Sequence, residues 1–253
     1  MSGARYPALA GRHVVVTGGA DGIGAALVEA FCAQQALVTF LDIDDARAAA
    51  TVERAAAGGT VPHFVHCDVA DVPALRSALA EAEARDGAVR VLVNNAANDA
   101  RHDWREVTPE SWDAGLAVNL RHQFFAIQAV ADGMAMAGGG SIINFSSISW
   151  KLGMGGMPAY TTSKSGVIGL TRSFARDLGP ANIRVNAVLP GWIMTRRQRE
   201  LYLTPEGEEK LLADQCLKRV LMPADVAPLV LFLADDASAA CTAQSYVIDG
   251  GWI

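Results

Sequence analysis

A run of β-branched residues near the start of the chain leads directly into a glycine-rich turn. The run His13–Thr17 predicts a buried strand, and a helical pattern follows over 25–34. Between them the glycines are spaced Gly18-x-x-x-Gly22-x-Gly24. Glycines permit a tight turn and a close backbone approach, and the N-terminus of the helix presents free N–H groups to an anion. The chain is therefore expected to begin as a strand–turn–helix unit that can bind a phosphate.

The same alternation of strand and helix patterns continues along the chain. Further strands are expected at 36–42, 63–69, 89–93, 141–147, 183–189 and 246–248, with helices at 44–57, 71–86, 108–136, around Tyr160, and at 223–234. The pattern predicts an α/β protein, a single doubly wound Rossmann domain over 1–253, with a parallel sheet of about seven strands and helices on both faces. The mixed and charged stretch 192–218 is expected to form a substrate-loop segment.

Composition excludes several functional classes. The net charge of −6 argues against a nucleic-acid partner. Cys32, Cys67, Cys216 and Cys241 form no C-x-x-C pair, and the histidines have no metal-ligand spacing, so we expect no disulfide framework and no metal. Neither a signal peptide nor an apolar run long enough to span a membrane is recognised, and a cytoplasmic protein is expected.

An acidic residue ends the second expected strand, about 20 positions after the glycine turn. A dinucleotide-binding fold places a carboxylate there, on the ribose hydroxyls of the adenosine. Asp42, together with Asp21 in the turn, would repel a 2′-phosphate, and the nearest cation, Arg47, is expected on the next helix. These features favour NAD as the cofactor. Asp42 could instead be a solvated strand end, and Asp68, after the third strand, could contact the adenine or cap the next helix.

Tyr160 and Lys164 stand four residues apart, which on a helix places them on one face, one turn from each other. A free phenol has a pKa near 10. An ammonium about 4 Å away in a partly desolvated site would favour the phenolate by roughly 4 kcal/mol, or about 3 pK units. The pair could therefore act as a general acid–base group near neutral pH, although a surface tyrosine and lysine on an amphipathic helix would have the same spacing.

Taken together, the motifs resemble those of the short-chain dehydrogenase/reductase family over nearly the whole chain. The matching positions, in family order, are Thr17-Gly18-x-x-x-Gly22-x-Gly24, Asn94-Asn95-Ala96, Asn119, Ser147, Tyr160-x-x-x-Lys164 and Pro190-Gly191-x-x-x-Thr195. One position departs from the family pattern, because Ala97 stands where a glycine is usual.

The resemblance implies a role for each of these positions. The implied catalytic residues are Asn119, Ser147, Tyr160 and Lys164: Tyr160 exchanges the proton, Lys164 lowers its pKa, Ser147 bonds the substrate oxygen, and Asn119 holds a water in a proton relay. The implied NAD-binding residues are Gly18, Asp21, Gly22, Ile23, Gly24, Asp42, Asp68, Val69, Asn95, Ala96, Tyr160, Lys164, Pro190, Gly191, Ile193 and Thr195. The family is commonly tetrameric, so a homotetramer is expected.

The substrate is expected beyond the carboxyl ends of the strands. There, short polar residues stand beside tryptophans, which suits a small polyol better than a steroid or acyl chain. The expected substrate residues are Asn98, Asp99, Ser147, Ser149 and Trp192. The segments 98–102, 119–122, 203–208, 214–218 and 238–252 also resemble those of bacterial aldose 1-dehydrogenases, which oxidise D-xylose, L-arabinose or L-fucose at C1 to lactones.

Two other functions stay open at this stage. One is a different reductase of the same fold, such as a 3-oxoacyl or general secondary-alcohol reductase, which commonly uses NADPH. The other is a catalytically inactive module that senses nucleotides, against which the intact Asn119, Ser147, Tyr160 and Lys164 argue.

Overall fold

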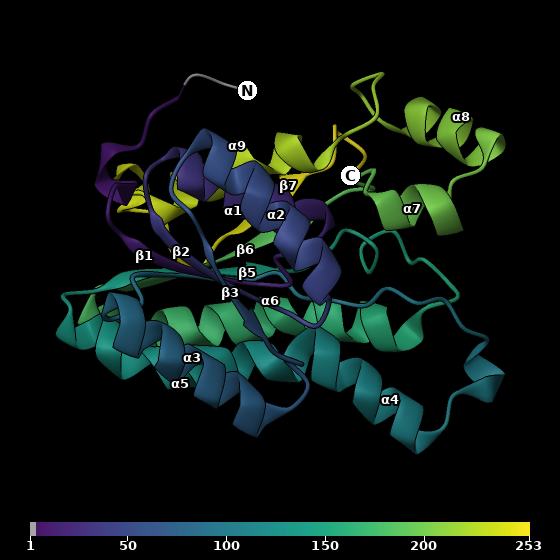
Figure 1. Ribbon diagram of the computed structural model, residues 1–253. Coiled ribbons are helices and arrows are strands. Elements are labelled where there is room, and N and C mark those ends of the chain that lie inside the picture. The colour runs from purple at the N-terminus through teal and green to yellow at the C-terminus, as the bar shows by residue number, and fades with distance from the viewer. Residues whose placement is uncertain (1–3) are drawn as a thin grey trace.

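A seven-stranded parallel sheet forms the centre of the computed structural model, which describes residues 4–253 (Figure 1). The strands are β1 (His13–Thr17), β2 (Leu37–Asp42), β3 (His63–His66), β4 (Val91–Asn94), β5 (Gly140–Phe145), β6 (Ile183–Pro190) and β7 (Ser245–Ile248). Their order in the sheet is β3-β2-β1-β4-β5-β6-β7. The prediction of a parallel sheet of about seven strands is confirmed.

Helices cover both faces of this sheet. They are α1 (Gly22–Ala33), α2 (Asp45–Gly58), α3 (Val72–Asp86), α4 (Pro109–Leu116), α5 (His122–Met136), α6 (Pro158–Leu178), α7 (Arg196–Leu201), α8 (Pro205–Asp214) and α9 (Pro223–Ala234). Helices α1, α2 and α9 lie on one face and α3, α5 and α6 on the other (Figure 1). No helix within 4–253 is long and apolar enough to cross a membrane.

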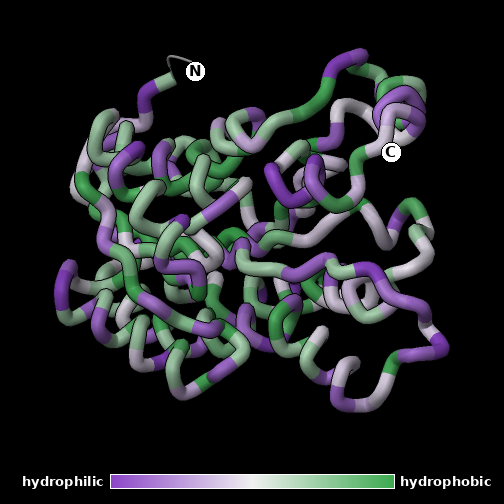
Figure 2. The backbone as a smooth tube through the Cα atoms, turned by 45° about the vertical axis from the view of Figure 1, so that its right-hand side comes forward, coloured by the Kyte–Doolittle hydropathy of each residue, from purple (hydrophilic) through white to green (hydrophobic). Residues whose placement is uncertain are grey.

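The alternation of side chains along each strand divides the core into two layers. In β1, Val14 and Val16 pack with α1 and α9 residues such as Leu27, while Val15 packs on the opposite face with residues such as Ile127 of α5. All five β1 residues are buried, as expected for a central parallel strand. Figure 2 shows hydrophobic stretches running through the interior and hydrophilic ones in the outer turns.

Most elements lie within about three residues of the expected ranges, and three stretches call for a physical reason. Strand β3 ends at His66 because the Asp68 carboxylate accepts the Ala70 N–H in a turn. The helix expected over 108–136 is interrupted by a π-helical turn at Ala117–Arg121, which contains Asn119. Segment 192–218 contains the two helices α7 and α8, which lie beyond one end of the sheet (Figure 1).

The central strands β1 and β4 are neighbours, although β2, β3 and their helices intervene in the sequence. The chain therefore leaves these two strands in opposite directions, and a crevice opens beyond their carboxyl ends. The glycine-rich turn follows β1, and the Asn95 segment follows β4. The fold thus brings the two motifs to one edge of the sheet.

Candidate active site

In the glycine-rich turn, backbone atoms approach one another so closely that side chains would not fit. The absence of side chains leaves room for a ligand. A Cβ on Gly24 would lie 1.8 Å from the Gly18 carbonyl oxygen. Gly18 has φ +70°, and a Cβ there would lie 2.8 Å from the Ala96 Cα. The Asn95 amide fixes the turn by donating to the carbonyls of Thr17 and Gly18, both at 3.0 Å. This cradle at the N-terminus of α1 fits the pyrophosphate of a dinucleotide.

Asp42 is held rigidly at the end of β2. Its carboxylate accepts hydrogen bonds from the backbone N–H groups of Ala20 (2.9 Å), Ile43 (2.8 Å) and Asp44 (3.1 Å). The two oxygens can accept about four hydrogen bonds in all, so acceptor capacity remains for a ribose hydroxyl. Asp42 is therefore more than a solvated strand end, because it also braces the glycine-rich turn.

Asp21 has two cationic neighbours that the sequence spacing did not predict. Its carboxylate lies 3.6 Å from Arg47 Nε and 3.0 Å from Arg196 Nη2. Arg47 is on α2, as expected, but its side chain turns back toward the glycine-rich turn. These cations reduce the repulsion that Asp21 would exert on a phosphate. Asp68 is exposed and does not cap α3, because Asp71 does so; its neighbour Val69 is buried.

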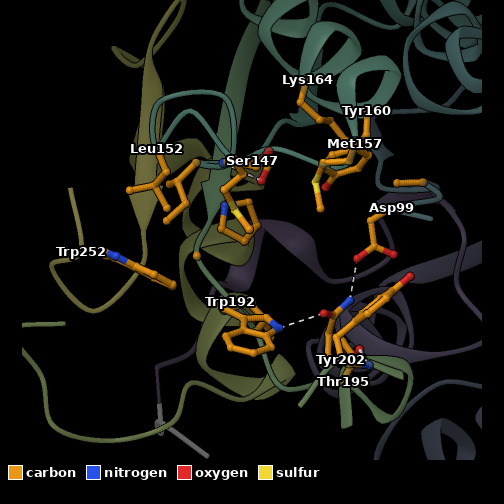
Figure 3. A pocket seen from close by; sticks show the side chains of 18 of the residues that line it. Asp99, Ser147, Leu152, Met157, Tyr160, Lys164, Trp192, Thr195, Tyr202 and Trp252 are labelled. Carbon is orange, nitrogen blue, oxygen red and sulfur yellow. Dashed lines mark hydrogen bonds between the residues drawn. The ribbon is translucent and has the colours of Figure 1, made fainter. Parts of the chain in front are cut away.

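Beyond the sheet edge lies a cavity of about 710 Å³, lined by residues from β5, β6 and their loops, from α6, and from the α7–α8 segment (Figure 3). The predicted site residues on its wall are Ile23, Asn95, Asp99, Ser147, Ser149, Tyr160, Lys164, Pro190, Gly191, Trp192, Ile193 and Thr195. The predicted positions that do not line this cavity are Gly18, Asp21, Gly22, Gly24, Asp42, Asp68, Val69, Ala96, Asn98 and Asn119.

Tyr160 and Lys164 lie one turn apart on α6, as the spacing predicted. The Lys164 ammonium lies 5.6 Å from the centre of the Tyr160 ring and donates to the Phe145 carbonyl at 2.8 Å. Ser147 lies beside them on the cavity wall (Figure 3), and its hydroxyl accepts the Ser149 N–H at 3.1 Å. Ser146 instead donates its hydroxyl to the Lys164 carbonyl at 2.6 Å, so Ser147 is the better placed serine.

The pKa of Tyr160 is raised in this structure, which is opposite to the net lowering that was expected from Lys164. Burial raises the pKa of Tyr160 above its ordinary value, the Asp99 carboxylate raises it further, and a hydrogen bond with Ser147 opposes the shift. Burial also lowers the pKa of Lys164 to about 7, against an opposing effect of Asp99. The two neutral forms are favoured together because both groups lie in a poorly solvated site.

Asn119 braces the loop that follows β4. Its side-chain oxygen accepts the Asn98 N–H at 2.9 Å, and its amide donates to the carbonyls of Asn98 and Gly115, both at 3.0 Å. The side chain is thus engaged with the backbone. The Asn119 carbonyl, within the π-helical turn, accepts a long hydrogen bond of 3.5 Å from the Gln123 side chain.

The expected substrate residues separate into two groups. Asp99, Ser147, Ser149 and Trp192 line the cavity. Asn98 does not line it, because its side chain is exposed and accepts hydrogen bonds from the Ala100 N–H and from Arg197. Ser149 Oγ is buried and has no hydrogen-bond partner among residues 4–253.

Sequence reasoning missed much of the apolar wall. Leu152, Met154, Met157 and Leu211 line the cavity, yet they come from loops and a helix whose pattern gave no sign of a shared surface. The expected substrate-loop segment 192–218 and the segment 98–102 do reach the cavity, but the sequence did not single out the polar residues that line it, which are Arg101, Gln198, Tyr202, Thr204, Lys210 and Asp214. Arg101 stacks on the Tyr202 ring, with its guanidinium carbon 4.2 Å from the ring centre.

Comparisons with known proteins agree with this geometry. A family model described as "Enoyl-(Acyl carrier protein) reductase" matches residues 18–253. The chain is 55% identical to the "Probable galactose dehydrogenase GalD" of Rhizobium meliloti (strain 1021), over 99% of this chain and 98% of that one. It is 49% identical to the "D-xylose 1-dehydrogenase" of Caulobacter vibrioides (strain NA1000 / CB15N), over 100% of both chains.

A solved structure extends the agreement to the whole fold. The "short-chain type dehydrogenase/reductase from Mycobacterium ulcerans" is 26% identical and superposes with a TM-score of 0.91, over 97% of this chain and 90% of that one. The fold, the ordered motifs and the full-length relatives lead to one conclusion. This chain belongs to the short-chain dehydrogenase/reductase family of oxidoreductases.

Proposed function

We propose that this protein oxidises the C1 hydroxyl of a free aldose, a pentose or a 6-deoxyhexose, to the lactone with NAD as hydride acceptor. The observation that carries the proposal is the placement of Asp99 beside Tyr160 in a cavity that Trp192 also lines (Figure 3). A carboxylate accepts hydrogen bonds from sugar hydroxyls, and an indole packs against the C–H face of a sugar ring. The two relatives named as sugar dehydrogenases support the same substrate class.

The catalytic roles follow from the chemistry of the cavity wall. Tyr160 takes the proton of the C1 hydroxyl while the C1 hydrogen leaves as hydride, and Ser147 donates a hydrogen bond to the substrate oxygen. Bound NAD supplies the hydride acceptor and a cationic ring whose charge favours the phenolate. Lys164 binds the nicotinamide ribose, and Asn119 maintains the loop that carries Asp99 through its bonds to Asn98.

NAD rather than NADP is the proposed cofactor because Asp42 stands where the ribose hydroxyls are expected. Gly18, Gly22, Gly24, Asn95 and Ala96 form the cradle beneath the pyrophosphate. Asp68 and Val69 would lie at the adenine, and Ile23, Pro190, Gly191, Ile193 and Thr195 at the nicotinamide end. Segment 192–218 acts as the substrate loop. A homotetramer and a cytoplasmic location remain predictions from the sequence.

NADH formation with a panel of aldoses tests the proposal directly. We expect turnover with at least one pentose or 6-deoxyhexose, and a lactone as the first product by NMR. The apolar residues Leu152, Met154 and Met157 favour a second candidate, a 3-oxoacyl or secondary-alcohol reductase, because they could hold an alkyl chain. Turnover of a 3-hydroxyacyl thioester or a secondary alcohol without turnover of any aldose would favour that candidate.

A further inference from the structure

The carboxylate of Asp99 is held by two neighbouring side chains of α7. Arg197 Nε donates to Oδ1 at 3.1 Å, and Gln198 Nε2 donates to Oδ2 at 2.6 Å. Each carboxylate oxygen thus receives one hydrogen bond from α7 and keeps acceptor capacity for another donor. Asp99 and its two partners are about a hundred positions apart in the sequence. The contact with Gln198 joins two walls of the cavity, and the contact with Arg197 supports Asp99 from outside the cavity lining.

The contacts continue on both sides of Asp99. Trp192 Nε1 donates to the side-chain oxygen of Gln198 at 2.8 Å, and this bond and the one from Gln198 to Asp99 appear as dashed lines in Figure 3. On the other side, Arg197 Nη2 donates to the Asn98 side chain at 3.1 Å. Asp99 and Trp192, the proposed acceptor and ring platform for the sugar, are therefore connected through one glutamine amide.

The charge of Asp99 also reaches the catalytic pair. Asp99 lines the same cavity as Tyr160 and Lys164, and its carboxylate raises the pKa of both. Arg197 is the cation that contacts this carboxylate directly. Arg197 itself does not line the cavity. Besides Asp99 and Lys164, the charged side chains on its wall are Arg101, Lys210 and Asp214, of which the last two pair with each other at 2.8 Å.

We propose that Arg197 and Gln198 are positioning residues, which orient Asp99 as the acceptor of hydroxyl groups on an uncharged sugar. Arg197 in addition offsets the charge of Asp99 beside Tyr160, and Gln198 fixes the distance between Asp99 and Trp192. The assignment rests on the proposed oxidation of an aldose. It further specifies the substrate class, because an aldonate or a sugar phosphate would bring an anion to the Asp99 carboxylate.

Two substitutions on α7 separate these roles. Arg197→Met removes a charge and two hydrogen bonds, to Asp99 and Asn98, whereas Gln198→Leu removes hydrogen bonds only. Each is expected to raise KM for the aldose about tenfold, with NAD affinity changed less than about twofold. Arg197→Met should also move the apparent pKa of kcat/KM upward, since an unbalanced Asp99 disfavours the phenolate. Gln198→Leu should leave that pKa in place, and Arg197→Lys should restore it.

Arg199→Met is the matched control, since Arg199 is on the same helix and contacts Met222 rather than the cavity. Its kinetics should equal those of the wild type. In an Asp99→Asn background, Arg197→Met should raise KM for the aldose no further, because Asp99, the partner of Arg197, is already changed. Full additivity of the two changes, or wild-type KM values in both α7 variants, would overturn the assignment. Absence of any aldose oxidation by the wild type would instead overturn the proposed function, and the assignment with it.

Discussion

Arg196 and Asp21, 175 positions apart in the sequence, are joined by two hydrogen bonds. Arg196 Nε and Nη2 donate to the same oxygen of the Asp21 carboxylate at 3.2 and 3.0 Å. Asp21 caps the N-terminus of α1, and Arg196 begins α7. Since the next two residues of α7 hold Asp99, three consecutive side chains connect the cofactor turn with the substrate wall.

The first prediction concerns this ion pair. Arg196→Met should raise the dissociation constant of NAD about two- to threefold at low salt, because α7 is no longer attached to the glycine-rich turn. Both side chains are about two-fifths exposed, at 43% and 40%, so solvent and ions screen the pair. The difference from wild type should therefore disappear in high salt. Fluorescence titration with NAD at two salt concentrations measures this, and a difference that persists at high salt would contradict it.

The second prediction concerns the choice of cofactor. NAD should give a higher kcat/KM than NADP, and Asp42→Ala combined with Asp21→Arg should narrow or reverse the preference. Asp42→Ala should also lower thermal stability, because the N–H groups of Ala20, Ile43 and Asp44 lose their acceptor. Asp42→Asn is the matched control, since it keeps an acceptor oxygen without the charge. A wild-type enzyme with a strong preference for NADP would refute the assignment.

The third prediction concerns Tyr160 and Lys164. Tyr160→Phe should abolish turnover and leave NAD binding nearly intact, whereas Lys164→Met should damage both. Burial and Asp99 raise the pKa of Tyr160, so the base form becomes more populated only as the pH rises. Oxidation should therefore become faster with pH throughout the range from neutral to alkaline. A rate that falls as the pH rises over this range, or substantial activity of Tyr160→Phe, would contradict the assignment of Tyr160 as the base.

Much of the fold follows from patterns in the sequence. Each central strand is a short apolar run between turn signals. Helices α6 and α9 have a proline in the first turn, Pro158 and Pro223, which is a signal for the start of a helix. The π-helical turn at Asn119 could not be predicted this way. One added residue in a helix barely changes the hydrophobic pattern, so the sequence does not distinguish a π-helical turn from an α-helical one.

The site was predicted where local spacing determines geometry, and missed where distant segments meet. The position of Tyr160 relative to Lys164 follows from one helical turn. The raised pKa of Tyr160 does not, because it depends on burial and on Asp99, a residue from another loop. Similarly, nothing in the order of residues predicts that Gln198 reaches both Asp99 and Trp192.

The last prediction concerns His122, a buried histidine beside the catalytic helix. Burial, and then the Lys164 charge, lowers its pKa to about 3, while hydrogen bonding to the backbone of Ala117 and Val118 opposes the shift. The unfolded chain, with a histidine pKa near 6.5, takes up this proton first as the pH falls. The stability that the neutral ring contributes is therefore complete above pH 6.5 and is lost progressively between pH 6.5 and 3.

By this effect alone, the free energy of unfolding should fall by about 2 kcal/mol between pH 7 and pH 5. In His122→Leu, which has no imidazole to protonate, the free energy of unfolding should fall by about 2 kcal/mol less over the same pH change. Urea unfolding at both pH values measures this. An equal loss in the two proteins would mean that other groups govern the acid sensitivity.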